Sequence, residues 1–312
     1  RERAIKLLDT DKVDLLVGPT SSSDALAILG LAEEYKRILF LEPAAADVLT
    51  GPQGNRFVFR TGRNTAQDAE AMAAVITKNV PKARVAAFAP DTAFGRAGVA
   101  PFKAALERKG GTVVIEEYAP ATATDFTPFI TRVINTKPDY TFVIWAGANN
   151  PWRQMTDLGL FKATKVTTGA PELAALRSMQ HMVGMPGFTV YYHGVAKNPV
   201  NEWLIKEHQA RFNNPPDIFV SGGMAAAMAV VTALEKTKGV TEAETMIAAL
   251  RGMEFNSPTG MRIFRSEDHQ AQQPLFEIEF TIVPGVDHVV PRLVRVIPRE
   301  DVADPIKVTH KR

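Results

Sequence analysis

The sequence predicts an α/β protein built from parallel β-sheets with helices on both faces. Three observations support this prediction. Short apolar segments alternate with segments of helical periodicity along most of the chain, and repeated strand–helix–strand units are typical of such sheets. The first apolar segments end at Gly18-Pro19 and Glu42-Pro43, where turns are expected. A length of 312 residues is comfortable for two lobes, each with its own core.

The elements follow one another in a regular order, beginning with a helical pattern at Arg1–Leu8. Strands are expected at Val13–Val17, Ile38–Leu41, Arg56–Arg60, Ala83–Ala89, Thr112–Glu117, Tyr140–Trp145, Lys165–Thr168 and Phe188–Tyr192. Helices are expected between them at Asp24–Tyr35, Thr65–Asn79, Gly95–Lys109, Phe126–Thr136, Trp152–Leu158 and Glu172–Met179. Because the chain begins within a helical pattern and without a methionine, we expect it to be N-terminally incomplete, so that any export signal lies outside it.

The last part of the chain is expected to change from helices to strands. Helices are predicted at Asn201–Arg211, Gly222–Lys236 and Thr241–Leu250. The second of these is rich in alanine and methionine, and we expect it to be buried in a core. From Gly260 onward, strands are expected around Arg262–Phe264, Leu275–Ile282 and Leu293–Val296.

The composition is that of an ordinary globular protein, with 46% hydrophobic residues, 22% charged residues and a net charge of +2. The basic residues do not cluster with aromatic residues, so neither a nucleic acid nor an anionic membrane is a predicted partner. No apolar run is expected to reach the length of a membrane span, and direct membrane insertion is not predicted. The absence of cysteine excludes disulfides, thiolate metal sites and a cysteine nucleophile.

The turn Gly18-Pro19-Thr20-Ser21-Ser22-Ser23 separates the first predicted strand from its helix. Free N–H groups and the positive end of the helix dipole allow such a helix start to hold an anion, and serine hydroxyls can add hydrogen bonds. The alternative is that one serine caps the helix and the others are solvated. The residues of this turn leave both interpretations open.

Five polar or aromatic loops follow predicted strands and form a candidate site. They contain Ser21–Ser23, Glu42–Ala46, Pro90–Phe94, Trp145–Pro151 and Gly169–Glu172. In open α/β sheets, ligands bind beyond the carboxyl ends of the strands. We therefore expect these loops to contact a ligand.

The sequence gives no positive support for an enzyme. The six histidines lack metal-ligand spacing, and neither a G-x-S-x-G elbow nor a G-x-x-x-x-G-K-S/T phosphate loop occurs. Asp24, Glu42, Asp91 and Glu172 fall at predicted strand ends, but nothing fixes the separation that paired-carboxylate chemistry needs. We predict no catalytic residue, no metal and no cofactor.

Seven segments recur in a characteristic order: Gly18–Ser23, Leu41–Ala46, Phe59–Thr61, Asp91–Gly98, Thr124–Phe126, Pro138-Asp139, and Ser257–Gly260 with Phe264. In this order they resemble the type 1 periplasmic solute-binding proteins of ABC transporters. The resemblance is strongest to the leucine/isoleucine/valine-binding branch, also called the hydrophobic amino acid and amide uptake family. It covers nearly the whole chain, although that family begins with a strand and a ligand-contacting loop before the helix that opens this sequence.

The resemblance implies two α/β lobes, each a parallel sheet with helices on both faces, that close on a solute. Lobe one would comprise residues 1–60 and 192–255, and lobe two residues 61–191 and 256–312. Three hinge crossings are implied, at Phe57–Thr61, Thr189–Tyr192 and near Glu254–Gly260.

The resemblance also implies ligand contacts from lobe one. Ser22 is similar to the family serine that binds the ligand carboxylate, with Ser21 and Ser23 beside it. Ala44 falls where a backbone carbonyl accepts a hydrogen bond from the ligand ammonium, and Ala45 follows it.

Contacts from the other lobe are implied as well, together with two departures from the family pattern. Phe94 falls where an aromatic residue covers the ligand, and Glu172 lies near the family glutamate that pairs with the ligand ammonium. Ala46 replaces a threonine and Ala148 replaces a tyrosine, with Asn149-Asn150 adjacent. For Phe94 the alternative is core packing at a strand–helix junction.

Glu42 is the largest departure, because the family usually has a small polar residue at this position. Its carboxylate could meet a cationic or hydroxyl-bearing group of the ligand. The alternative, which is the preferred interpretation from sequence, is a salt bridge to a neighbouring arginine or lysine. Trp145 and Trp152 are expected to pack in a core or on a lobe surface rather than against the ligand.

Ala46 and Ala148 lack the hydroxyl groups of the threonine and tyrosine that they replace, so the implied pocket is larger and more apolar. The residues that are implied to bind the carboxylate are kept. We therefore expect a small carboxylate-bearing solute: a branched-chain or hydrophobic amino acid, an amide or an aromatic acid. The main hypothesis is an extracytoplasmic, periplasmic binding protein that delivers this solute to an ABC transporter permease. The alternatives are a ligand-sensing regulatory domain of the same fold and, third, an enzyme that uses the strand-end carboxylates.

Overall fold

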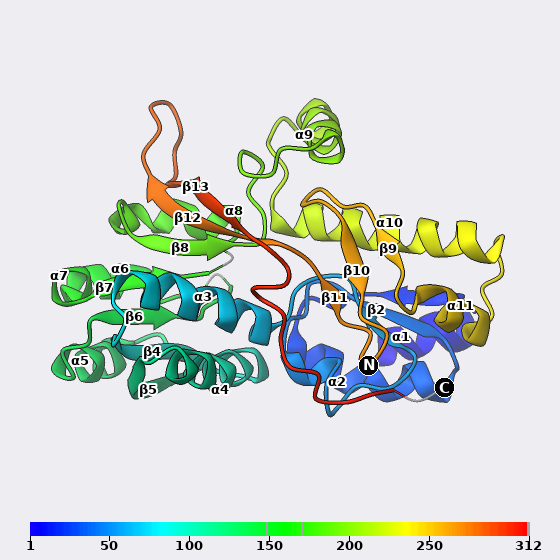
Figure 1. The fold of residues 1–312 in the computed structure, drawn as a ribbon, viewed down its shortest axis with the longest axis horizontal. Helices are drawn as coiled ribbons and strands as arrows, with labels where there is room; N and C mark the ends of the chain where they lie inside the picture. Colours follow the sequence, from blue (N-terminus) through cyan, green and yellow to red (C-terminus); the bar gives the residue numbers. More distant parts are fainter. Residues whose placement is uncertain (148, 170, 311–312) are drawn as a thin grey trace. The chain divides into compact units, whose positions relative to one another are not determined.

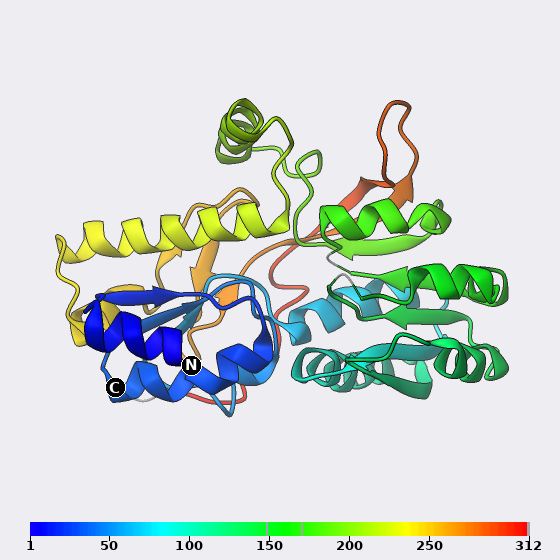
Figure 2. The same ribbon diagram turned by 180° about the vertical axis from the view of Figure 1, so that it is seen from behind.

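The structure, a computed structural model, describes residues 1–147, 149–169 and 171–310. It divides into two compact units, drawn in Figures 1 and 2. Unit 1 comprises Arg1–Asn64, Ala196–Gln273 and Ala303–Arg312, and unit 2 comprises Thr65–Val195 and Pro274–Val302. The chain therefore passes between the units at four points, after Asn64, Val195, Gln273 and Val302.

This division differs from the lobe boundaries that the family resemblance implies. Residues 256–273 and 303–312 lie in unit 1, not with the second lobe, and the boundaries near residues 60 and 192 each move by a few positions. Hydrogen bonds within unit 1 explain the placement of the first segment: Arg262 Nη1 donates to the Thr61 carbonyl at 2.6 Å. Arg265 Nη1 donates to the Asp304 carbonyl at 2.7 Å, which joins the C-terminal segment to the same unit.

Unit 1 contains a parallel sheet in the order β1-β2-β3, formed by Leu15–Val17, Ile38–Leu41 and Val58–Arg60. All four residues of the central strand β2 are buried, as expected for a strand covered on both faces. A small antiparallel sheet is formed by β9 (Glu254–Phe255), β10 (Arg262–Phe264) and β11 (Ala271–Gln272). A single bridge between Arg60 and Gln270 lies between the two sheets.

The α-helices of unit 1 are α1 (Glu2–Ile5), α2 (Ser22–Glu34), α9 (Pro199–Phe212), α10 (Ile218–Thr237) and α11 (Ala243–Leu250). A π-helix at Lys6–Thr10 continues α1, and a 3-10 helix covers Asp47–Leu49.

Helix α10 is less buried than the sequence suggested. One face buries small residues such as Ala225 and Ala229, whereas Phe219 is 42% and Val231 53% exposed. By length and composition α10 could cross a membrane, which corrects the expectation that no apolar run reaches that length. Of its most apolar 18-residue stretch, 33% is buried. Core helices of globular proteins meet the same criteria, and α10 packs against α11 and β9.

Unit 2 contains a parallel sheet in the order β5-β4-β6-β7. Its strands are β4 (Arg84–Asp91), β5 (Thr112–Pro120), β6 (Tyr140–Val143) and β7 (Lys165–Thr168). An antiparallel sheet in the order β13-β12-β8 is formed by Val290–Ile297, Leu275–Thr281 and Pro186–Thr189, and a bridge between Gly169 and Phe188 lies between the two sheets. The expectation of one parallel sheet per lobe is therefore incomplete, because both units add antiparallel strands.

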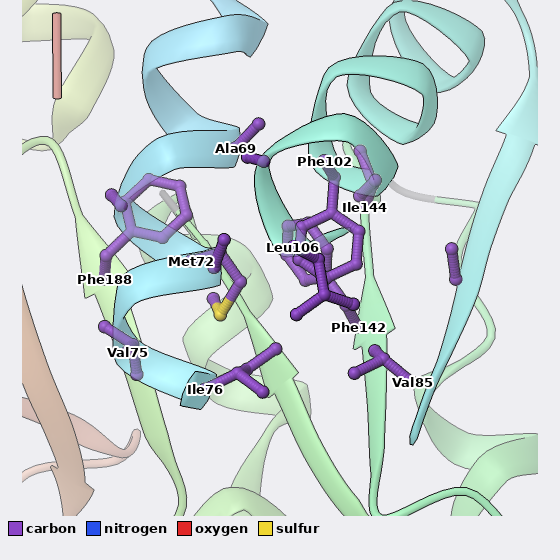
Figure 3. Packing of buried hydrophobic residues seen from close by; sticks show 14 of the residues in the cluster. Ala69, Met72, Val75, Ile76, Val85, Phe102, Leu106, Phe142, Ile144 and Phe188 are labelled. Carbon is purple, nitrogen blue, oxygen red and sulfur yellow. The ribbon is translucent and has the colours of Figure 1, made fainter. Parts of the chain in front are cut away.

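The α-helices of unit 2 are α3 (Thr65–Asn79), α4 (Ala93–Arg108), α5 (Thr127–Asn135), α6 (Trp152–Asp157), α7 (Leu160–Ala163) and α8 (Leu173–Ser178). A 3-10 helix follows at Gln180–Met182. The core packs α3 and α4 against the parallel sheet: Figure 3 shows Met72 and Ile76 of α3 and Phe102 of α4 beside Phe142 of β6. Phe102 and Phe142 have ring centroids 4.6 Å apart. The predicted α/β class is confirmed.

Candidate functional site

The start of α2 is capped by Ser21. Its backbone is extended, with φ −81° and ψ 132°, and its Oγ accepts a hydrogen bond from the Asp24 N–H at 3.3 Å. The helix therefore begins at Ser22, two residues earlier than the sequence pattern indicated. Ser21 thus has the capping role that the sequence offered as the alternative to ligand binding.

Ser22 links α2 to the loop after β2. Its side chain is 4% exposed, and its Oγ accepts a hydrogen bond from the Ala46 N–H at 3.1 Å. The first N–H groups of a helix have no intrahelical partner. Those of Asp24 and Ala25 bond to Ser21, whereas the N–H groups of Ser22 and Ser23 have no acceptor within the described ranges. Ser23 is exposed.

The segment Ala44-Ala45-Ala46 is buried, with each residue at most 3% exposed. Arg60 holds it in place: Nη1 donates to the Ala45 carbonyl at 3.2 Å and Nη2 to the Ala46 carbonyl at 2.6 Å. Burial lowers the pKa of Arg60 to about 10, against the opposing effect of Asp304. Arg60 therefore stays protonated at neutral pH and supplies both hydrogen bonds. The sequence indicated Phe59-Arg60-Thr61 as a motif but did not assign this role.

Glu42 lies at the end of β2 and has no salt-bridge partner within the described ranges, so the preferred sequence interpretation is wrong. Its Oε2 instead accepts a hydrogen bond from Thr61 Oγ1 at 2.9 Å. Glu42 lines a pocket of about 350 Å³, a size typical of small-molecule sites. The pocket is lined by Val17, Gly18, Thr20, Glu42, Pro43, Phe219 and Gly223. Val17 of β1 and Phe219 and Gly223 of α10 thus line the same pocket.

The buried side chain of Arg262 fixes the position of Thr61, the residue that donates a hydrogen bond to Glu42. Arg262 is 2% exposed and donates to the Thr61 carbonyl, while its Nε donates to Ser257 Oγ at 3.0 Å. Burial lowers the pKa of Arg262 to about 10, and the charge of Glu42 opposes this shift. Thr61 is therefore held on its backbone side by Arg262 and holds Glu42 with its side chain. Neither Thr61 nor Arg262 was predicted from the sequence to be part of the site.

Phe94 lies in unit 2 at the start of α4, where Thr92 caps the helix by accepting a hydrogen bond from the Gly95 N–H at 3.1 Å. Its side chain is half-buried and packs against the core that contains Phe102. The core-packing interpretation is therefore correct for part of the ring. The half-buried position also leaves part of the ring uncovered.

The loop after β6 is organised by Asn149. Its Nδ2 donates to the Ala123 carbonyl at 2.9 Å, and its own carbonyl accepts a hydrogen bond from Trp145 Nε1 at 2.8 Å. Trp145 also packs edge-on against Phe126, as expected for a packing residue. Asn149 therefore has a structural role. Asn150 is half-buried, and Ala148 lies outside the described residues.

Glu172 occupies the N-cap position of α8 with extended backbone, φ −74° and ψ 163°, but its side chain makes no capping hydrogen bond. It is half-buried. Within residues 1–147, 149–169 and 171–310, no group of three or more His, Cys, Asp or Glu side chains is arranged to hold a metal ion.

The predicted residues thus fall into two sets. In unit 1 the fold brings together the start of α2, the loop at Ala44–Ala46 and the Glu42 pocket. Unit 2 carries Phe94, Asn149, Asn150 and Glu172. Phe219 and Gly223 of α10 also line the pocket and were missed, because their helix was read only as core.

Comparison with known proteins places this fold in a family. Residues 1–281 match the periplasmic binding protein family. The Leu/Ile/Val-binding protein BraC3 of Rhizobium johnstonii is 26% identical over 258 residues, which cover 80% of this chain and 68% of that protein.

Two solved structures from Rhodopseudomonas palustris are similar over nearly the whole chain. The structure of an ABC-type branched-chain amino acid transporter is 44% identical with a TM-score of 0.85, covering 99% of this chain and 84% of that one. A solute-binding protein of an ABC transporter in complex with 3,4-dihydroxybenzoic acid is 26% identical with a TM-score of 0.85, covering 96% and 82%. This chain therefore belongs to the periplasmic binding protein family, with the type 1 fold, in the group of the Leu/Ile/Val-binding proteins of ABC transporters.

Proposed function

We propose that this protein is an extracytoplasmic solute-binding protein that captures a small carboxylate-bearing solute and delivers it to an ABC transporter permease. The solute class is a branched-chain or hydrophobic amino acid, an amide or an aromatic acid. Two relatives support this range: a branched-chain amino acid transporter structure at 44% identity and a dihydroxybenzoate complex at 26% identity. Membership of the periplasmic binding protein family supports the proposed extracytoplasmic location and the proposed permease partner.

The observation that carries the proposal concerns the N–H groups of Ser22 and Ser23 at the start of α2, which have no acceptor among the residues that the structure describes. These groups point along the helix axis at its positive end, where a carboxylate is stabilised. Ser22 Oγ already accepts the Ala46 N–H, so its own proton is left to donate to a carboxylate oxygen. Asp24 in the same turn adds a negative charge that weakens the site, and an anion must therefore bind through close hydrogen bonds.

The remaining contacts belong to the same proposal. The backbone at Ala44–Ala46 would form one wall of the site, held in place by Arg60. Phe94 and Glu172 remain solute contacts that the family resemblance implies. Ser21 and Asn149 would support the site rather than touch the solute, because both side chains already make hydrogen bonds to backbone groups.

The test is a thermal-shift screen against amino acids, aromatic carboxylic acids and amides, with mass spectrometry of any solute that co-purifies. A ligand of the native state stabilises it by about 2.7 kcal/mol at 100 times its Kd, which raises the melting temperature by several degrees. At least one carboxylate is expected to give this shift. If no carboxylate shifts the melting temperature and no solute co-purifies, the proposal fails.

A further inference from the structure

Glu42 lines a pocket, and its carboxylate makes one hydrogen bond, to Thr61, within the described ranges. We infer that Glu42 is a specificity-determining residue, which accepts a hydrogen bond from an N–H or O–H group on the solute. The site would therefore select solutes that carry a hydrogen-bond donor in addition to a carboxylate. This inference rests on the proposed function and names the solute class more narrowly.

The position of Glu42 is fixed by groups that do not use all its acceptor capacity. Thr61 Oγ1 donates to Oε2 at 2.9 Å, and Arg262 fixes Thr61 through the carbonyl of that residue. A carboxylate has about four lone-pair sites. Oε1 receives no hydrogen bond within the described residues, so it is the oxygen available to a solute.

Two glycines make room for this carboxylate. A Cβ on Gly222 of α10 would lie 2.3 Å from Glu42 Oε1, and a Cβ on Gly62 would lie 2.8 Å from Oε2. Both distances are shorter than any van der Waals contact, so any larger residue at either position would displace the carboxylate. The carboxylate of Glu42 therefore occupies a space between α10 and the segment after β3 that exists because both positions are glycine.

The charge of Glu42 could also serve only to balance the buried arginines. It acts against the burial that lowers the pKa of Arg60 and Arg262. That role needs the charge to be near but does not need it to face a pocket. The side chain is half-buried rather than buried, and it borders the hollow next to Gly18 and Thr20 at the loop before α2. A solute carboxylate at the α2 start and a donor group near Glu42 would therefore lie in one site.

The experiment compares pairs of probes that differ only in the donor: leucine with isocaproate, and para-hydroxybenzoate with benzoate. Binding of all four is measured by calorimetry to the full chain and to its Glu42→Ala and Glu42→Gln variants. In the unchanged protein, the donor-bearing member of at least one pair should bind about tenfold more tightly or better, the value of one hydrogen bond to a charged group. Glu42→Ala should remove this preference and leave the affinity for the donor-free member within about twofold of that of the unchanged protein. Glu42→Gln should remove part of the preference.

Two further variants separate selection from charge balance. Gly222→Ala keeps the Glu42 charge but displaces its Oε1, and it should reduce the preference as Glu42→Ala does. Gly30→Ala is the matched control, because a Cβ on this exposed residue of α2 meets nothing within 4 Å. Glu34→Gln removes the same charge as Glu42→Gln from the exposed end of α2 and should leave both affinities unchanged.

The outcomes distinguish this inference from the proposed function. If the unchanged protein binds none of the four probes and no other carboxylate, both fail. If it binds them but shows no donor preference, or if the Glu42 variants weaken both members of a pair equally, the role of Glu42 in selection is overturned and solute capture still holds. A Glu42→Ala variant that melts lower but keeps its preference would assign Glu42 to charge balance alone.

Discussion

Ser22 Oγ accepts a hydrogen bond from the Ala46 N–H at 3.1 Å, so the side chain expected to bind a ligand carboxylate also fastens the loop after β2. Both residues are buried, at 4% and 0% exposure. The two positions are 24 residues apart in the chain. A substitution at Ser22 is therefore expected to affect stability as well as the proposed binding of the solute.

Ser22→Ala should lower the free energy of unfolding by about 1–3 kcal/mol, because it leaves the buried Ala46 N–H without a partner. It should also weaken binding of the solute by about 1–3 kcal/mol if the Ser22 hydroxyl donates to the solute carboxylate. Ser21→Ala is the matched control: loss of the cap costs about 1 kcal/mol of stability without a comparable loss of affinity. Urea unfolding and calorimetry measure the two effects separately. Equal losses of affinity in both variants would contradict the assignment of separate roles.

Arg60→Lys should lower the free energy of unfolding by about 2 kcal/mol or more. The lysine ammonium cannot reproduce both fork-like hydrogen bonds to the Ala45 and Ala46 carbonyls, and one buried carbonyl is left unpaired. Arg56→Lys is the control, because Arg56 pairs with the exposed Glu244, and such pairs contribute about 1 kcal/mol or less. The measurement is urea unfolding at neutral pH. Similar losses in the two variants would mean that Arg60 does not hold this loop.

His269 should make the stability depend on pH. Burial, and then the nearby charges of His310 and Arg251, lower the pKa of His269 from 6.5 to about 3. Between these two values the unfolded chain binds a proton that the folded chain does not, so stability is fully present above pH 6.5 and falls as the pH is lowered toward 3. The slope from this residue is at most about 1.4 kcal/mol per pH unit.

The variant His269→Asn tests this pH dependence. Asparagine does not titrate and tolerates the positive φ of 61° at this position. It loses the stacking of His269 on Phe59, at 3.9 Å between ring centroids, so its absolute stability falls. The informative quantity is the slope of the unfolding free energy between pH 6.5 and pH 4, which should be smaller in the variant. An unchanged slope would assign the pH dependence to other groups.

Phe94 should contribute to both packing and binding. Phe94→Ala removes a half-buried ring from the unit 2 core and should lower the free energy of unfolding by about 1–3 kcal/mol. Phe94→Tyr keeps the ring and should retain both stability and affinity. If solute affinity in Phe94→Ala matches that of the unchanged protein while its melting temperature falls, the residue serves core packing alone.

The sequence predicted the secondary structure well where the periodicity was strong. The apolar run Ile38–Leu41 and the helix over Thr65–Asn79 have the expected bounds. The two-residue strands β9 and β11 and the single turn α7 were missed, because segments of two to four residues carry no measurable period. The cap was assigned to the right turn but not to Ser21 in particular, since the first residue of a helix is uncertain by one or two positions.

The candidate site was predicted as a set of loops, but its contacts were not. Glu42 was placed correctly at a strand end, and its partner was expected to be a basic side chain. The partner is Thr61, and the space for the carboxylate comes from Gly222 in a helix far along the chain. Similarly, α10 has apolar residues all around, so its pattern could not identify the face with Phe219 and Val231 that is left exposed.

The sequence by itself determined the α/β class, the order of most elements and the family, because local periodicity and the order of short motifs are properties of the chain alone. Only the tertiary structure decided that Ser22 meets Ala46, that Arg60 holds the Ala45 and Ala46 carbonyls and that the C-terminal segment belongs to unit 1. Periodicity reports which side of an element is apolar. Which residues meet across an interior depends on the register and packing of segments that are distant in sequence, and these follow from the whole fold.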